Sequence, residues 1–174
     1  FTSEDKKIHA NNIDRSSNTS FLFTEDISGI KIGTAATWDA IIGDNTVGGS
    51  SKMMTFSAWV YKTGDGGFNS GRIIDFGESD VAFYTDAQDE VRFTAKWAGS
   101  GIYWTTHTPV GSIIKDSWYH IVVTYDATHK DNDPVVYING KETAVSKSSG
   151  TRANPYSGIT TEECYIGNRD DASS

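Results

Sequence analysis

The fold is decided by residues 116–126, which read DSWYHIVVTYD. Residues that alternate along this stretch fall on two faces, and a period of two residues is typical of a β-strand. We therefore predict a strand from Trp118 to Asp126. One face of it carries Tyr119, Ile121, Val123 and Tyr125, and the other carries Trp118, His120, Val122 and Thr124.

Outward from this strand, short apolar runs recur between turn residues. Thr55 to Lys62 alternates in the same way, and Asn139-Gly140 joins two runs, 135–138 and 141–145. Asn-Gly between two such runs is the strongest short-range signal for a β-hairpin, because both residues tolerate positive φ. No stretch has helical spacing, so we predict an all-β fold. The remaining predicted strands are 20–23, 30–32, 72–76, 81–85, 91–97, 102–106 and 164–166.

Length and composition limit the number of domains and the kinds of partner. The chain has 174 residues and a mass of 19.0 kDa, which suits one domain. We assign the polar, aperiodic residues 1–17 to an N-terminal arm or linker, and 18–174 to the β domain. The formal net charge of −8 disfavours nucleic acid. No apolar run approaches the roughly 20 residues that membrane insertion requires.

The one cysteine, Cys164, cannot form a disulfide within the chain. It directly precedes Tyr165-Ile166, so we expect a small buried strand residue. A thiol nucleophile is the alternative.

The strand motifs resemble the laminin G-like domains of the concanavalin A-like lectin/glucanase superfamily. The likeness rests on residues 116–126, on VYINGK at 136–141 and on YIGN at 165–168; FSAWV at 56–60 resembles the early core strand of the family, and 20–32 its opening strand pair. The resemblance extends over roughly 20–168. It implies two curved antiparallel sheets packed face to face as a jelly-roll sandwich.

The family also has a last strand after the Ile-Gly segment, and this chain stops at 170–174, DDASS. A sandwich without its last strand exposes a sheet edge, which invites pairing with other strands. We expect either that more residues follow or that the N-terminal arm covers that edge, and we favour a fragment of a longer protein.

Aromatic residues around the Gly99-Ser100-Gly101 turn are candidates for a glycan platform. Sugar C–H faces stack on rings, while sugar hydroxyls need directed polar partners. A hairpin at this turn would bring Trp97 and Trp104 together; the alternative is that both rings fill the core. We expect the mid-strand Trp59 and Trp118 to lie in the core. The predicted ligand-binding residues are Trp97, Tyr103, Trp104, His107, Asn69, Arg72 and Tyr84.

Acidic residues near the two ends of the chain suggest a structural calcium. Glu25 and Asp26 lie between the first two strands, where members of the family hold calcium, and Asp170 approaches from the other end. Carboxylate oxygens in loops are the ligands that calcium prefers. The alternative is that each cluster is a solvated loop.

Catalysis is not predicted. Glycosidases of this superfamily carry alternating acids on one strand, as Glu-x-Asp-x-x-Glu, so that two carboxylates flank the scissile bond. No predicted strand has this pattern, and Glu78-Ser79-Asp80 lacks the third acid.

We therefore predict a non-catalytic binding or adhesion module that recognises glycans within a larger extracellular, cell-surface or virion-surface protein. Two alternatives stay open. One is a structural decoration or interaction domain of a virus (phage) particle, which would contact a protein surface and assemble into the particle. The other is a glycoside hydrolase of the same fold.

Overall fold

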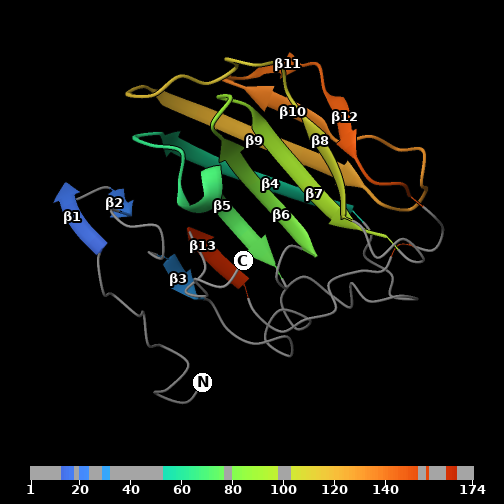
Figure 1. Ribbon diagram of the computed structural model, residues 1–174, viewed down its shortest axis with the longest axis horizontal. Coiled ribbons are helices and arrows are strands. Elements are labelled where there is room, and N and C mark those ends of the chain that lie inside the picture. The colour runs from blue at the N-terminus through green and yellow to red at the C-terminus, as the bar shows by residue number, and fades with distance from the viewer. Residues whose placement is uncertain are drawn as a thin grey trace.

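The computed structural model describes residues 13–17, 20–23, 29–31, 53–76, 80–97, 103–152, 156 and 164–167. Within these residues the fold is all-β, with two main antiparallel sheets that lie face to face (Figure 1). This confirms the predicted sandwich. The described residues include no helix with the length and apolarity needed to cross a bilayer.

Among the described residues, the smaller sheet has four strands in the order β11-β10-β9-β4. They are β11 (Lys141–Thr143), β10 (Val135–Ile138), β9 (Trp118–Asp126) and β4 (Met53–Tyr61). β4 pairs with β9 over its full length, from Met53 opposite Asp126 to Tyr61 opposite Trp118. The predicted alternation is confirmed, because Ile121, Val123 and Tyr125 are buried and the residues between them are not.

The described part of the larger sheet has seven strands in the order β12-β8-β7-β6-β5-β13-β3. They are β12 (Ser146–Ser149), β8 (Tyr103–His107), β7 (Val91–Lys96), β6 (Val81–Asp86), β5 (Ser70–Phe76), β13 (Cys164–Gly167) and β3 (Gly29–Lys31). A short 3-10 turn, η1 (Gly67–Asn69), precedes β5. A separate two-stranded sheet is made of β1 (Ile13–Ser17) and β2 (Ser20–Phe23).

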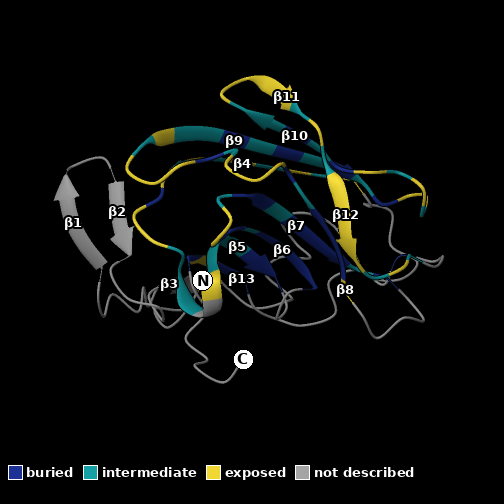
Figure 2. Ribbon diagram, turned by 45° about the horizontal axis from the view of Figure 1, so that its top comes forward, coloured by how far each residue is buried: buried dark blue, intermediate teal, exposed yellow. Residues whose placement is uncertain are grey.

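The core fills the space between the two main sheets (Figure 2), and β6, β7 and β9 each contribute two or three of its buried side chains. Aromatic contacts join the layers: the ring centroid of Phe93 on β7 lies 5.0 Å from that of Tyr125 on β9. Each large apolar side chain buried here contributes about 1.5–3 kcal/mol to folding. Cys164 lies in this core, fully buried, and burial together with the nearby Asp75 raises the pKa of its thiol to about 12.

The hairpin of β10 and β11 turns at Asn139-Gly140, as predicted. Asn139 has φ 51° and Gly140 has φ 77°, which is the left-handed backbone that this pair of residues tolerates. The side-chain Oδ1 of Asn139 also accepts a hydrogen bond from the backbone N–H of His120 at 2.9 Å. The turn is thereby tied to β9.

Two features differ from the expectations. β12 forms from residues 146–149, where no strand was predicted; all four of its residues are exposed, so no hydrophobic pattern marks it. β1 lies within the stretch assigned to an N-terminal arm or linker, and that assignment stays a prediction. Trp59 and Trp118 are not core residues, because their exposed fractions are 66% and 52% and they lie on the outer face of the smaller sheet.

Candidate functional site

Two of the predicted ligand-binding residues, Trp97 and Trp104, belong to the core. Their exposed fractions are 1% and 0%. The indole N–H of Trp97 donates to the hydroxyl of Tyr125 at 3.1 Å, and the ring of Trp104 stacks on that of Tyr125 with centroids 5.7 Å apart. Neither indole presents a face to solvent, so these two residues do not form the platform that the sequence suggested. Both rings fill the core, which is the alternative that the sequence left open.

Three other predicted residues come together on the outer face of the larger sheet. Residues that pair across neighbouring strands share a face, and the register places Arg72 opposite Tyr84, Tyr84 opposite Arg92, and Arg92 opposite His107. These four residues on β5, β6, β7 and β8 are called the polar row below. Val91 and Phe93, the neighbours of Arg92 in the chain, point into the core.

The last two predicted residues lie beside the row or away from it. Tyr103 lies four residues before His107 on β8, faces the same side and is 39% exposed. Asn69 is exposed in the 3-10 turn η1 before β5, outside the row.

The turn between β6 and β7 positions a carboxylate beside the polar row. Oδ1 of Asp86 accepts hydrogen bonds from the backbone N–H groups of Gln88 and Glu90, at 3.1 and 3.0 Å. Asp89 takes a positive φ of 59°, which aspartate adopts more readily than most residues. The chain thereby reverses tightly, and Glu90 enters β7 on the same side as Arg92.

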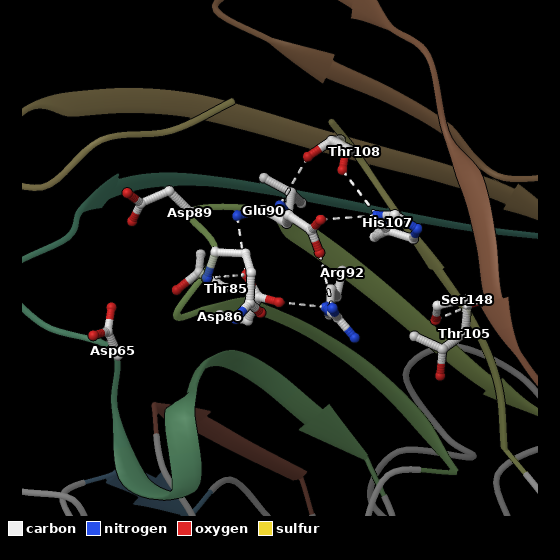
Figure 3. Close-up of polar contacts among 12 residues, drawn as sticks. Asp65, Thr85, Asp86, Asp89, Glu90, Arg92, Thr105, His107, Thr108 and Ser148 are labelled. Carbon is white, nitrogen blue, oxygen red and sulfur yellow. Dashed lines mark hydrogen bonds and ion pairs between the residues drawn. The ribbon is translucent and has the colours of Figure 1, made fainter. Parts of the chain in front are cut away.

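Glu90 binds two members of the polar row at once (Figure 3). Its Oε2 lies 2.8 Å from Nη2 of Arg92, and its Oε1 lies 3.1 Å from Nδ1 of His107. Asp86 adds an ion pair of 2.6 Å between its Oδ2 and Nε of Arg92. The side chains of Glu90 and Asp86 are only 4% and 6% exposed, so two buried carboxylates lie beside Arg92 and His107, whose side chains are 26% and 25% exposed.

These contacts leave Nη1 of Arg92 and Nε2 of His107 unused. Among the described residues, Nη1 of Arg92 takes part in no hydrogen bond or ion pair, and it carries two N–H donors. Nδ1 of His107 faces two acceptors, Glu90 Oε1 and the carbonyl of Thr108 at 3.1 Å. We therefore assign the proton of the neutral ring to Nδ1, which makes Nε2 the acceptor. Partial burial disfavours the charge of Arg92, but Asp86 and Glu90 outweigh it and raise the pKa of its guanidinium.

The other cations of this face are paired with buried acids as well. Nη1 of Arg72 lies 2.5 Å from Oδ2 of Asp75, and Nζ of Lys96 lies 2.7 Å from Oδ1 of Asp80. The side chains of Asp75 and Asp80 are 0% and 1% exposed. Because each cation has its own carboxylate, the face offers directed hydrogen bonds rather than a field that would attract any anion.

The residues proposed for calcium, Glu25, Asp26 and Asp170, lie outside the described residues. Within the described ranges, no three His, Cys, Asp or Glu side chains gather in a way that could hold a metal ion.

Sequence reasoning missed Glu90 and Arg92, although residues 89–93, DEVRF, contain the signal. Their alternation puts Glu90 and Arg92 on one face and Val91 and Phe93 on the other. An acid two residues before an arginine, directly after a turn, was the available cue, although the sequence does not show that the two side chains pair.

Comparison with known proteins agrees with this fold. The family model Laminin_G_3, described as the concanavalin A-like lectin/glucanases superfamily, matches residues 33–174. The chain therefore belongs to the concanavalin A-like lectin/glucanase superfamily. A comparison with curated proteins found no match.

Among solved structures, the chain is similar to the CBM40 of the Ruminococcus gnavus IT-sialidase bound to α2,3-sialyllactose. Identity is 13%, the TM-score is 0.52, and the match covers 82% of this chain and 80% of that one. The same CBM40 bound to α2,6-sialyllactose matches with 15% identity and a TM-score of 0.40, over 84% and 92% of the two chains. The first of these likenesses supports the jelly-roll fold.

Proposed function

We propose that the protein is a non-catalytic glycan-binding module and that the outer face of the larger sheet is its binding surface. One observation carries the proposal: Glu90 contacts both Arg92 and His107, which lie opposite each other on β7 and β8, and leaves a donor of Arg92 and an acceptor of His107 unused. Both groups are held before any ligand arrives, which lowers the entropic cost of binding.

A sugar fits this pair because each hydroxyl both donates and accepts a hydrogen bond. Nη1 of Arg92 would donate to one hydroxyl, and Nε2 of His107 would accept from the same hydroxyl or the next. Tyr84 in the polar row and Tyr103 beside it add rings on which apolar sugar faces can stack.

The likeness to the sialyllactose-bound CBM40 supports a glycan ligand at the level of the fold. That neighbour is a module of a sialidase, which supports the further proposal that this chain works within a larger extracellular or particle-surface protein. A structural calcium at Glu25, Asp26 and Asp170 remains part of the same proposal. It would act on stability and not on the polar row.

A glycan panel of neutral and sialylated oligosaccharides tests the proposal. We expect the wild-type protein to bind a subset, and Arg92→Lys to weaken that binding at least tenfold, or about 1.4 kcal/mol. Lysine keeps the charge but loses the fork that Asp86 and Glu90 hold.

Two substitutions of His107 distinguish the contributions of its two ring nitrogens to binding. Glutamine can place an amide near the position of Nε2, whereas asparagine reaches only the position of Nδ1, so His107→Gln should retain more binding than His107→Asn. His129→Gln, at an exposed histidine in a distant loop, is the matched control. A wild-type protein that binds no glycan would refute the proposal. Release of reducing sugar from a bound glycan would contradict the proposal that the module is non-catalytic.

A further inference from the structure

The two unused groups of the polar row, Nη1 of Arg92 and Nε2 of His107, require different partners in a ligand. Nη1 of Arg92 can only donate a hydrogen bond. With the proton of the neutral His107 ring on Nδ1, its Nε2 can only accept one. A hydroxyl satisfies either group, because it both donates and accepts. An ionised carboxylate offers acceptors only, so it leaves Nε2 of His107 without a donor.

The charges in direct contact with Arg92 favour the same class of ligand (Figure 3). Its Nη2 lies 2.8 Å from Oε2 of Glu90, and its Nε lies 2.6 Å from Oδ2 of Asp86. Nη1 is bonded to the same carbon as these two nitrogens, which places it within about 5 Å of both carboxylate oxygens. A group bound at Nη1 therefore meets one positive charge and two negative charges. Both carboxylates are buried, so salt and water screen them less than they screen surface acids.

The neighbouring cations and the chain as a whole do not reverse this balance. Nη1 of Arg72 lies 2.5 Å from Oδ2 of Asp75. Likewise, Nζ of Lys96 lies 2.7 Å from Oδ1 of Asp80, so each cation has a carboxylate against it. The formal net charge of −8 on the full chain adds a long-range repulsion of anions. A carboxylate would also lose its hydration on binding, which costs more for a charge than for a hydroxyl.

We propose that the polar row selects uncharged glycans and discriminates against glycans that carry a carboxylate. This inference rests on the proposed function, because it takes Arg92 and His107 as the glycan site and adds the class of glycan. Glu90 is then a specificity-determining residue for two reasons. It accepts from Nδ1 of His107, which leaves Nε2 as the acceptor, and it places a negative charge beside Arg92.

The experiment measures sugars as acids and as the methyl esters of those acids, which differ in charge but little in shape. The starting glycan is the tightest binder in the panel of neutral and sialylated oligosaccharides. A neutral glycan is first oxidised, in turn, at each primary hydroxyl to give the acids. By isothermal titration calorimetry, no acid should bind the wild-type protein more tightly than its ester. At least one acid should bind about threefold or more weakly than its ester, because the charge lies near the carboxylates.

Glu90→Gln tests the source of this preference. Removal of one negative charge should narrow the largest difference between acid and ester by about threefold, even if both forms bind more weakly. The control is Glu142→Gln, which removes the same charge from the exposed strand β11 of the other sheet and should leave the difference unchanged. Circular dichroism checks that both variants are folded. If Glu90→Gln does not fold, the comparison on the wild-type protein still decides the inference.

Three results would overturn the inference and leave the proposed function standing. They are an acid that binds the wild-type protein more tightly than its ester, acids that all bind as tightly as their esters, and equal effects of Glu90→Gln and Glu142→Gln. A wild-type protein that binds no glycan in any form would instead refute the proposed function, and the inference would fall with it. The two failures are therefore distinguishable.

Discussion

Trp104 and Trp59 differ in solvent exposure and should therefore differ in their contribution to stability. Trp104 is fully buried, stacks on Tyr125 and has the guanidinium carbon of Arg152 4.1 Å from its ring centroid, whereas Trp59 is 66% exposed. We expect Trp104→Ala to lower the free energy of unfolding by about 3–5 kcal/mol, because it leaves a cavity. Trp59→Ala should cost about 1 kcal/mol or less, since it lies on the surface. Urea unfolding measures both, and similar losses would contradict the assignment.

The residues of the site were only partly predictable. Arg72, Tyr84 and His107 were selected from the sequence, and the strand register explains why they meet. Trp97 and Trp104 were selected on residue type, but a strand sequence does not say which of two faces meets the core when both carry apolar residues. Glu90 and Arg92 were passed over because a salt bridge at a turn depends on tertiary geometry.

At the scale of elements, a buried lysine ties the two sheets together. Lys62 follows β4, is 4% exposed, and places Nζ 2.5 Å from the carbonyl of Asp86 and from Oδ1 of Asp89 at the β6–β7 turn. It also lies 3.2 Å from Oδ1 of Asp65, whose Oδ2 is 2.9 Å from Nζ of Lys115. This network fixes the end of β4 beside the turn that positions Glu90.

The network makes part of the stability depend on pH. The hydrogen bond from Lys115, followed by that from Lys62, holds the pKa of Asp65 below its ordinary value despite the opposing effect of burial. A carboxyl with a lowered pKa in the folded state stabilises the fold above about pH 4 and loses that contribution as the pH falls further. The Asp65→Asn variant should therefore be less stable than the wild-type protein at neutral pH. Below about pH 4 the two proteins should have nearly the same free energy of unfolding. Denaturant unfolding at several pH values checks this, and a constant difference would contradict it.

Most elements could be predicted from the sequence, since β9, β10 and β2 have the expected bounds and β4 to β8 and β13 differ from them by only a residue or two. The alternation of buried residues and the Asn-Gly turn carry that information. β12 could not be found, because a polar edge strand is held by backbone pairing to β8 and has no buried face.

At the scale of the whole molecule, the sandwich divides its roles between two outer faces. The outer face of the larger sheet carries paired charges with an unused donor and acceptor, and that of the smaller sheet carries exposed rings. Membership in the concanavalin A-like superfamily fixes the layers but not the use of either face. The polar row is therefore the part of the account that most needs a direct measurement.

That measurement is the affinity of the wild-type protein and of Glu90→Gln for the glycan that binds tightest in the panel, by isothermal titration calorimetry. Glutamine has nearly the same shape as glutamate but gives up the charge that orients Arg92 and His107. The account predicts a folded variant whose Kd is at least tenfold higher. An unchanged Kd would show that the glycan binds elsewhere and would contradict the central claim.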